Sequence, residues 1–164
     1  MNESNPSYDA LAELLTLTVE VDGNGNVEYR NHLGQAHRIH GPAYISSDGS
    51  RWWYQNGHRH RDNGPAVIHS NGDLVWAING KYHREDGPAI EYADGGRRWY
   101  RRGLLHRTDG PAVIRADGTK EWYQNNNPHR TDGAAIEDAD GGRYWFLNGE
   151  RFTEREFNER VKSI

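Results

Sequence analysis

The chain has 164 residues, a formal net charge of −4 at pH 7 and a mean hydropathy of −1.04. The absence of cysteine excludes disulfides, thiolate metal sites and cysteine nucleophiles. No apolar run reaches the roughly 18 residues of a membrane span, and the N-terminus lacks a basic region followed by an apolar one. These features favour a soluble cytoplasmic protein without a transmembrane segment, and the acidic balance argues against generic nucleic-acid binding.

Residues 1–17 predict a polar tail followed by a capping helix. Ser7 can cap a short helix over Tyr8–Thr16, whose apolar residues fall on one face at helical spacing. We expect this helix to cover the first unit of the fold that follows. Binding of a partner is the alternative role for the same apolar face.

Residues 18–151 are organised by a step of 23 residues. A fixed period of this size is the signature of a repeat array, in which each unit buries its apolar face against its neighbours. The tryptophans that recur at the step are Trp53, Trp76, Trp99, Trp122 and Trp145. The histidines, each followed by arginine, are His37, His60, His83, His106 and His129. We name each copy after its tryptophan, and each runs from the alanine of one Gly-Pro-Ala segment to the residue before the next.

The first unit, residues 17–36, is degenerate. Thr18–Val21 and Val27–Arg30 flank Asp22-Gly23-Asn24-Gly25-Asn26, which predicts a hairpin turn. Arg30 stands where the step places a tryptophan. We therefore expect this unit to begin the sheet without contributing a full core.

Each of the five full copies predicts two short strands and two turns, and a long His-Arg loop follows in all but the last, where Phe152 occupies the histidine position. Asp-Gly or Asn-Gly joins the strands, and a second turn precedes the histidine. We expect the core face to combine the tryptophans with a first-strand column that is apolar in every copy: Tyr44, Val67, Ile90, Val113 and Ile136. Alternation along a strand places a second, mostly aromatic column on the opposite face, at Tyr54, Ala77, Tyr100, Tyr123 and Phe146. Either both faces are covered, or this face is an exposed aromatic strip.

Residues 152–164 predict a C-terminal capping helix. Thr153 and Glu156 have the spacing of a capping box, and Phe152 and Phe157 that of a hydrophobic staple. The fold class is therefore all-β: an open array of stacked antiparallel β-hairpins, one degenerate and five full, with a short capping helix at each end.

The order Trp, Asn-Gly, x-x-His, glycine and Asp-Gly, at a period of 23 residues, resembles the MORN repeat. The resemblance covers residues 18–151 and implies stacked hairpins in an elongated twisted sheet, used for scaffolding and for protein or lipid contact rather than for catalysis. The chain departs from that pattern in its loop, which reads His-Arg-x-Asp-Gly-Pro-Ala, as at His106–Ala112, where the typical repeat has a shorter His-Gly-x-Gly. It therefore looks like a divergent MORN-like variant of a phage or bacterial type.

The repeated histidines are poor metal ligands because equivalent residues lie two strands apart, roughly 10 Å. We expect the histidines and arginines to tie the loop to nearby carbonyls and to aspartates, with Arg107 pairing with an aspartate of a neighbouring copy. His58 and His60 could chelate a metal from alternate strand positions, but no third ligand is near in the sequence. The serines sit at turns and strand ends without a fixed partner. We therefore predict no catalytic residue, no metal and no cofactor.

Binding residues are expected where the copies differ. The Trp99 copy differs most, because four arginines bracket a Trp-Tyr pair, and arginine with aromatic residues is enriched at interfaces. Trp52 and Tyr54 form, with Trp53, three consecutive aromatic residues, more than one face can bury. The predicted partner-binding residues are Arg97, Arg98, Tyr100, Arg101, Arg102, Trp52 and Tyr54. A solvated edge balanced by local acidic residues is the alternative reading of the arginines.

The leading hypothesis is a non-enzymatic protein-binding repeat module whose partner presents an acidic surface. The resemblance to phage proteins extends it to an inhibitor of a host protein, such as a defence protein. The alternative is a sequestering protein for a small anionic ligand such as a nucleotide signal. Phospholipid binding ranks third because the chain is acidic, and pairing of open sheet edges would make a homodimer.

Overall fold

The computed structural model describes residues 16–163 as an all-β chain, an open antiparallel sheet of hairpins with the short helix α2 (Glu154–Val161) near the C-terminus. The chain divides after Lys81 into two compact units, which we treat separately as unit 1 and unit 2. Within the described residues, no helix is long and apolar enough to cross a membrane.

Unit 1 contains the degenerate hairpin, the Trp53 copy and most of the Trp76 copy. Its strands are β1 (Thr18–Val21), β2 (Val27–Arg30), β3 (Tyr44–Ile45), β4 (Arg51–Trp52), β5 (Tyr54–Gln55), β6 (His58–Arg59), β7 (Val67–Ile68), β8 (Leu74–Val75) and β9 (Ala77–Ile78). The order in its main sheet is β1-β2-β3-β4-β7-β8, with each strand antiparallel to the next. The strand β10 (Lys81–Tyr82) spans the division between the units.

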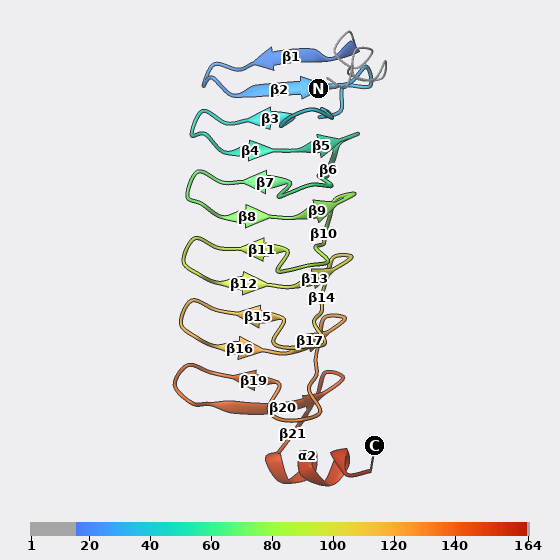
Figure 1. Cartoon of the computed structure of the whole chain (residues 1–164), viewed down its shortest axis with the longest axis vertical. Coiled ribbons are helices and arrows are strands. Elements are labelled where there is room, and N and C mark those ends of the chain that lie inside the picture. The colour runs from blue at the N-terminus through green and yellow to red at the C-terminus, as the bar shows by residue number, and fades with distance from the viewer. Residues whose placement is uncertain (1–15, 164) are drawn as a thin grey trace, which may run out of the picture. The chain divides into compact units, whose positions relative to one another are not determined.

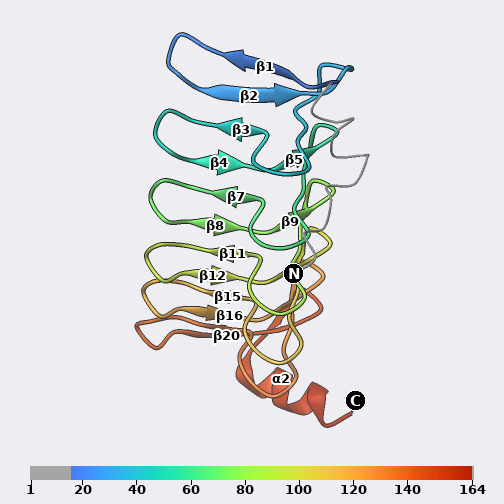
Figure 2. The same ribbon diagram turned by 45° about the horizontal axis from the view of Figure 1, so that its top comes forward.

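Unit 2 repeats the same plan. Its strands are β11 (Ile90–Glu91), β12 (Arg97–Arg98), β13 (Tyr100–Arg101), β14 (Leu104–Leu105), β15 (Val113–Ile114), β16 (Lys120–Glu121), β17 (Tyr123–Gln124), β18 (Asn127–Pro128), β19 (Ile136–Glu137), β20 (Arg143–Leu147) and β21 (Glu150–Phe152). Its main sheet runs β11-β12-β15-β16-β19-β20-β21. Two short hairpins, β13–β14 and β17–β18, lie beside the long hairpins (Figures 1 and 2).

Each copy bends at its tryptophan, so that the long hairpin gives way to a short one. In the Trp53 copy the N–H of Trp53 donates to the carbonyl oxygen of Ala66 in the next copy at 2.8 Å. The carbonyl oxygen of Trp53 accepts from the N–H of His60 at 3.0 Å. The same pair of bonds recurs at Trp99 and Trp122. The tryptophan backbone therefore joins the main sheet to the His-Arg loop.

Both predicted turns are present in every full copy. The short hairpins turn through two residues of positive φ, as at Asn56 (49°) and Gly57 (76°), which is the type I′ geometry favoured by Asn-Gly. In the long hairpins the glycine of Asp-Gly or Asn-Gly has a φ of 90–96°, and its N–H donates to the carbonyl three residues earlier. The side chain of Asp48 accepts from the N–H of Ser50 at 2.8 Å and holds this turn.

The expected core is wrong in one respect, because the tryptophans do not share a face with the Tyr44 column. The register pairs that column directly with the residues that precede the tryptophans: Tyr44 with Trp52, Val67 with Val75, and Val113 with Glu121. Directly paired residues share a face, so each tryptophan, one residue further on, lies on the opposite face. We call the face with the Tyr44 column face A and the face with the tryptophans face B. Five fully buried alanines lie beneath face B: Ala43, Ala66, Ala89, Ala112 and Ala135.

The aromatic column expected opposite the tryptophans is neither fully covered nor fully exposed. Ala77 is buried, and Tyr54, Tyr100, Tyr123 and Phe146 are half-buried on face A. Aromatic side chains therefore lie on both faces of the sheet, and on both faces they are only partly buried.

The degenerate unit contributes more than expected, because Tyr29 takes the place of the missing tryptophan. The N–H of Tyr29 donates to Ala43 at 2.7 Å, and its carbonyl oxygen accepts from the N–H of His37 at 2.9 Å. These are the two bonds that Trp53 makes in the next copy. Tyr29 lies one residue ahead of the 23-residue step, because the segment between it and His37 is one residue longer.

The C-terminal helix confirms the predicted capping box. The Thr153 hydroxyl accepts from the N–H of Glu156 at 3.3 Å, and the Glu156 carboxylate accepts from the N–H of Thr153 at 2.8 Å. Phe157 is buried where α2 packs against β20 and β21. The expected N-terminal helix over Tyr8–Thr16 lies, apart from Thr16, outside the described residues.

Candidate functional site

An arginine lies against the preceding aromatic ring in the His-Arg pairs of Arg38, Arg61, Arg107 and Arg130. We call Arg38, Arg61, Arg84, Arg107 and Arg130 the loop arginines. The distance from the guanidinium carbon to the ring centre is 3.9–4.2 Å in each of these contacts. The pairs are Arg38 with Tyr29, Arg61 with Trp53, Arg107 with Trp99, and Arg130 with Trp122. Such cation–π contacts contribute about 0.5–1 kcal/mol each at exposed sites.

Hydrogen bonds also hold each loop arginine in its loop. In all five, Nη1 donates to the carbonyl oxygen four residues on, at 3.1–3.4 Å. In the last three, Nε also donates to the aspartate two residues on, at 2.7–3.0 Å. This bond from the arginine is the main cause that holds the pKa of Asp86, Asp109 and Asp132 below its ordinary value of 3.8. The expected tie to carbonyls and aspartates is confirmed.

One detail of that expectation is wrong, because Arg107 pairs within its own loop. Its Nε lies 2.9 Å from Asp109 rather than reaching an aspartate of a neighbouring copy. The loop folds back under the guanidinium, so that its Gly-Pro-Ala segment lies close to the side chain of Arg107. A Cβ built at Gly110 would lie 3.0 Å from the guanidinium carbon of Arg107. A larger residue at this position would therefore require the guanidinium to move by a few tenths of an ångström.

The histidines join each copy to the next one. The Nδ1 of His37 accepts from the backbone N–H of Asn56 at 2.9 Å, and His129 accepts from Asn148 at 3.0 Å. The equivalent bonds occur at His60, His83 and His106, always with a residue 19 positions further on. The expected partner was a carbonyl, but the observed partner is a backbone N–H, which donates to Nδ1. Over residues 16–163, no group of three His, Asp or Glu side chains is placed to hold a metal ion.

The structure distributes the predicted arginines over both faces of the sheet. Arg98 lies on face A beside Val113, with its guanidinium 5.3 Å from the ring centre of Tyr92. Arg97 and Arg101 alternate with it and lie on face B, and Arg102 lies at the tip of the short hairpin. Arg97, Arg101 and Arg102 are exposed. Unlike the loop arginines, they form no side-chain hydrogen bond or ion pair with any described residue.

Arg102 also has an unusual backbone. Its φ is 54°, in the left-handed region, where the equivalent residues are Asn56, Asn79, Asn125 and Asn148. An arginine is strained in this conformation, and an asparagine tolerates it. Strain of this kind is an observation from which a functional role can be inferred.

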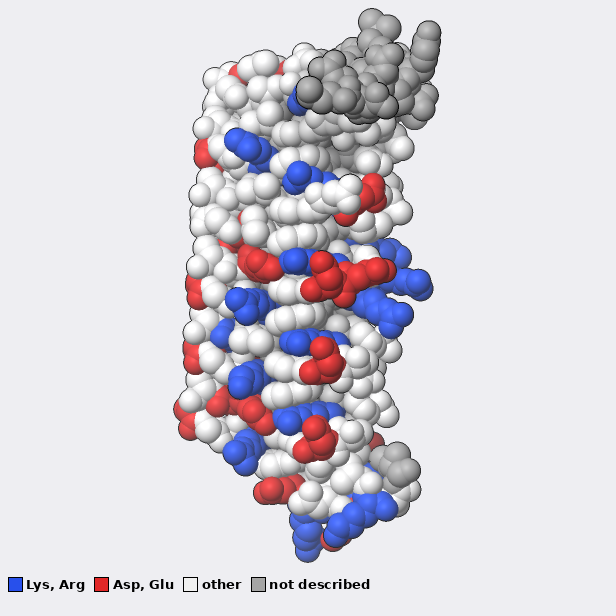
Figure 3. All heavy atoms as spheres, in the orientation of Figure 1, with Lys and Arg blue, Asp and Glu red and all other residues white. Residues whose placement is uncertain are grey.

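A groove of about 520 Å³ on face B lies next to these arginines. It opens between the His-Arg loops of two adjacent copies within unit 2, with Trp99 in its lining. Its basic and imidazole groups are His83, Arg84, Arg101, His106 and Arg107, and Glu85, Asp86 and Asp109 also line it. Figure 3 shows this mixture as neighbouring blue and red side chains in successive rows of the face. Arg84 and Arg107 are bound to these aspartates, so Arg101 is the arginine of the groove without a carboxylate partner among the described residues.

Trp52 and Tyr54 belong to unit 1 and lie on its face A. The Trp52 ring packs edge-on against Tyr44, with ring centres 5.1 Å apart, and against His69 at 5.6 Å. Both Trp52 and Tyr54 are half-buried. The expected anchor at Trp52 is therefore already engaged in packing, although part of its ring remains accessible.

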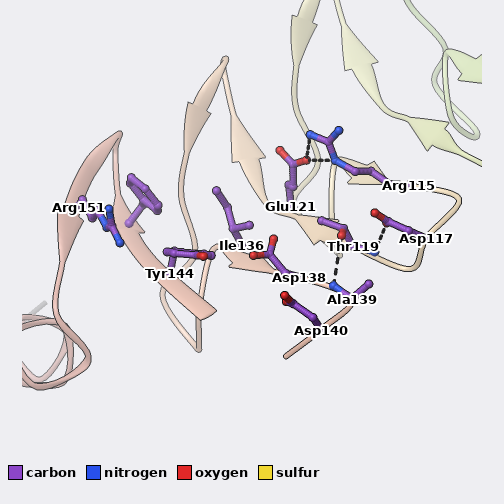
Figure 4. Close-up of a pocket in the computed structure, with 11 residues that line it drawn as sticks. Arg115, Asp117, Thr119, Glu121, Ile136, Asp138, Ala139, Asp140, Tyr144 and Arg151 are labelled. Atoms are coloured by element: carbon purple, nitrogen blue, oxygen red, sulfur yellow. Dashed lines mark hydrogen bonds and ion pairs between the residues drawn. The ribbon is translucent and has the colours of Figure 1, made fainter. Parts of the chain in front are cut away.

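Sequence reasoning did not single out a polar cluster on face A of unit 2, built around Glu121 (Figure 4). The side chain of Glu121 is 8% exposed and accepts from Nε of Arg115 at 2.7 Å and from the hydroxyl of Tyr123 at 3.1 Å. Burial first, and then Glu121, raises the pKa of Tyr123, and the bond to Glu121 raises that of Arg115. Arg115 and Glu121 also line an open cavity of about 670 Å³ with Tyr144. One sequence signal could have found this cluster. Glu121 stands at the repeat position that the Trp76 copy fills with the buried residue Val75.

A scan against models of known protein families finds no match to this chain. A search of curated proteins finds no similar sequence either.

Proposed function

We propose that the chain is a non-enzymatic protein-binding module that takes an acidic partner on the Trp99 copy. Arg101 and Arg102 are the central contacts of this proposal. Arg97 on the same face, and Arg98 and Tyr100 on face A, flank them. Trp52 and Tyr54 are secondary contacts in unit 1.

The observation that carries the proposal is the combination of an exposed side chain and a left-handed backbone at Arg102. Its side chain is exposed and has no partner among residues 16–163, while its backbone is held in a conformation that suits asparagine. An arginine at that position destabilises the turn without a compensating contact inside the described chain. A contact with another molecule accounts for that cost, and an arginine fork is well suited to a carboxylate.

The neighbouring charges support the same conclusion. The loop arginines are satisfied by carbonyls and, in three copies, by aspartates, so they are occupied in the fold. Arg101 stands where Gln55 and Gln124 occur in other copies and adds a charge at the edge of the groove. Unpaired arginines concentrated in one copy of an otherwise regular array indicate a local binding surface.

The resemblance to MORN-like repeats fits this proposal, because it implies a scaffold that contacts proteins. Within the proposal, the phage-type character of the repeat extends the function to the inhibition of a host protein. The antiparallel hairpin array and the repeated histidine bonds are compatible with such a scaffold.

The test is affinity capture from a host lysate with the wild type and with Arg101→Gln/Arg102→Asn. This variant restores the residues of the Trp53 copy, Gln55 and Asn56, and should fold at least as well as the wild type. We expect a partner that the wild type retains and the variant loses. Retention by both would refute the assignment of the site, and repeated failure of the wild type to capture any protein would refute the function.

A second candidate function is sequestration of a small anionic ligand in the groove beside Trp99. The favouring observation is that Arg101, His83 and His106 line one concave surface with an aromatic ring. A ligand at 100 times its Kd should raise the stability by about 2.7 kcal/mol. Thermal shift against a nucleotide panel tests this candidate, and the absence of a shift with every nucleotide would refute it.

A further inference from the structure

A single line of side chains crosses the main sheet of unit 2 on face B. The register pairs its members one after another from β11 to β20. In order, they are Glu91, Arg97, Ile114, Lys120, Glu137 and Arg143. Directly paired residues of an antiparallel sheet share a face, so these side chains form a line at right angles to the strands.

Every second member of this line is positively charged. We call Arg97, Lys120 and Arg143 the basic row, and all three are exposed. The acidic members of the line are turned toward the loops, where Glu91 binds Arg84 at 2.7 Å and Glu137 binds Arg130 at 2.8 Å. The basic row makes no side-chain hydrogen bond or ion pair with the part of the chain that the structure describes. Three cations with free donors therefore stand in a row.

The spacing of the row selects the geometry of an anionic partner. Successive members lie two strands apart, and strands are about 4.8 Å apart, so the row repeats at about 9.6 Å. A polyproline II helix has about three residues per turn and a rise of about 3.1 Å, so every third residue points the same way at about 9.3 Å. An extended β-strand points every second residue the same way, at about 6.6 Å. The polyproline II repeat matches the row, and the strand repeat does not.

The same face offers apolar contact beside the charges. Each basic residue is followed, two positions along the chain, by a half-buried tryptophan. These are Trp99, Trp122 and Trp145. Polyproline II ligands dock on surfaces lined by aromatic residues, where the preformed helix loses little conformational entropy on binding. Loop arginines lie against Trp99 and Trp122. The ring surface that stays accessible, together with the basic row, supplies both kinds of contact that an acidic, proline-rich segment needs.

We propose that the basic row binds a polyproline II segment that carries a carboxylate at every third residue and runs across the strands of unit 2. This inference rests on the proposed protein-binding function and specifies the form of the bound segment. It adds Lys120 and Arg143, which sequence differences between the copies did not single out. Arg97 is shared with the proposed contacts of the Trp99 copy.

The experiment compares two labelled peptides of identical composition by fluorescence anisotropy at low and at moderate salt. One is Glu-Pro-Pro repeated three times, with carboxylates at every third residue. The other is Pro-Pro-Glu-Pro-Glu-Pro-Glu-Pro-Pro, with carboxylates at every second residue. We expect the first peptide to bind the wild type at least tenfold more tightly, and we expect salt to weaken its binding.

Charge reversal then locates the site. Lys120→Glu/Arg143→Glu should weaken binding of the first peptide at least tenfold. The control Arg155→Glu/Lys162→Glu changes the net charge equally at exposed positions in and beside α2, away from the row, and should change affinity less than twofold. Equal affinity for the two peptides, or equal loss in the two variants, would overturn the inference. So would preferential binding of a single-stranded oligonucleotide that the row variant abolishes.

The outcome is separable from the proposed function. If Arg101→Gln/Arg102→Asn abolishes capture of a host protein while the two peptides bind alike, the protein-binding function stands and the basic row does not carry it. If the peptides discriminate as expected while no host protein is captured, the row is supported and the function on the Trp99 copy is refuted.

Discussion

The substitution Arg102→Asn should stabilise the protein, because it places the residue used by other copies in a left-handed turn. Arg102 has a φ of 54°, and the equivalent asparagines have values of 48–51°. The left-handed conformation costs an ordinary residue roughly 1–2 kcal/mol, and asparagine offsets part of this by local hydrogen bonding. The exposed Arg102 side chain has no described partner to lose, and the backbone N–H that donates to His83 at 3.3 Å is unchanged.

We therefore expect Arg102→Asn to raise the free energy of unfolding by about 0.5–1 kcal/mol. That change corresponds to about 1–4 °C in Tm for a chain of this size. Urea denaturation and calorimetry measure both quantities. The mirror variant Asn125→Arg, at the same turn position in the next copy, should lose a similar amount. A neutral or destabilising Arg102→Asn, together with a harmless Asn125→Arg, would show that the arginine is not strained and would remove the main support for the proposed site.

Three further outcomes test the fold and the buried charges. Gly110→Ala should destabilise the protein by about 1–3 kcal/mol in urea denaturation, because the new Cβ would lie 3.0 Å from the Arg107 guanidinium; no loss would contradict the close packing. Because Arg107 lowers the pKa of Asp109, the pair adds stability above pH 3.8 that disappears as the pH falls through the lowered folded pKa. Asp109→Asn should therefore be less stable than the wild type at pH 7, and the difference between the two should be smaller at pH 2.5. Urea midpoints of both proteins at the two pH values measure this. Glu121→Val should leave stability within about 1 kcal/mol, whereas Arg115→Ala, which strands the buried Glu121 carboxylate, should cost about 1–3 kcal/mol; equal effects of the two would refute the pairing.

Much of the fold follows from the sequence because the repeat is regular and its turns are specific. The Asn-Gly and Asp-Gly positions predicted both hairpins of each copy, and Thr153 with Glu156 predicted the cap of α2. The face of the tryptophans could not be deduced in the same way. A continuous strand through Trp53 was assumed, and the actual face depended on which residues pair across the sheet. Register sets that relation, and a single sequence does not reveal it.

Two residues show where column reasoning fails. Tyr29 was missed because the segment between it and His37 is one residue longer than in the full copies, so a fixed step places Arg30 at the tryptophan position. Its contact with Arg38 becomes visible only in space. Glu121 was not singled out as a core residue, because a carboxylate is rarely buried unless it is paired. Its partner Arg115 lies six residues earlier, across the predicted Asp117-Gly118 turn, and the sequence does not show that the two side chains meet.

The candidate binding residues were chosen by differences between copies, and this reasoning found Arg101 and Arg102. It could not separate Arg97 from Arg98, since only the alternation of an established strand assigns them to opposite faces. It also passed over Lys120 and Arg143, which are individually unremarkable surface cations. Their alignment comes from strand pairing across copies rather than from any local motif.

The histidine bonds have a consequence for how such a protein changes length. Each imidazole engages the turn 19 residues further on, so each copy recognises only the copy that follows it. A duplication or deletion of 23 residues at any phase would therefore leave every remaining copy with the donor that it needs. A change of any other length between a histidine and the turn 19 residues further on would separate the two. We therefore expect the fold to accept the gain or loss of whole copies, so that the number of copies can change without redesign of any one of them.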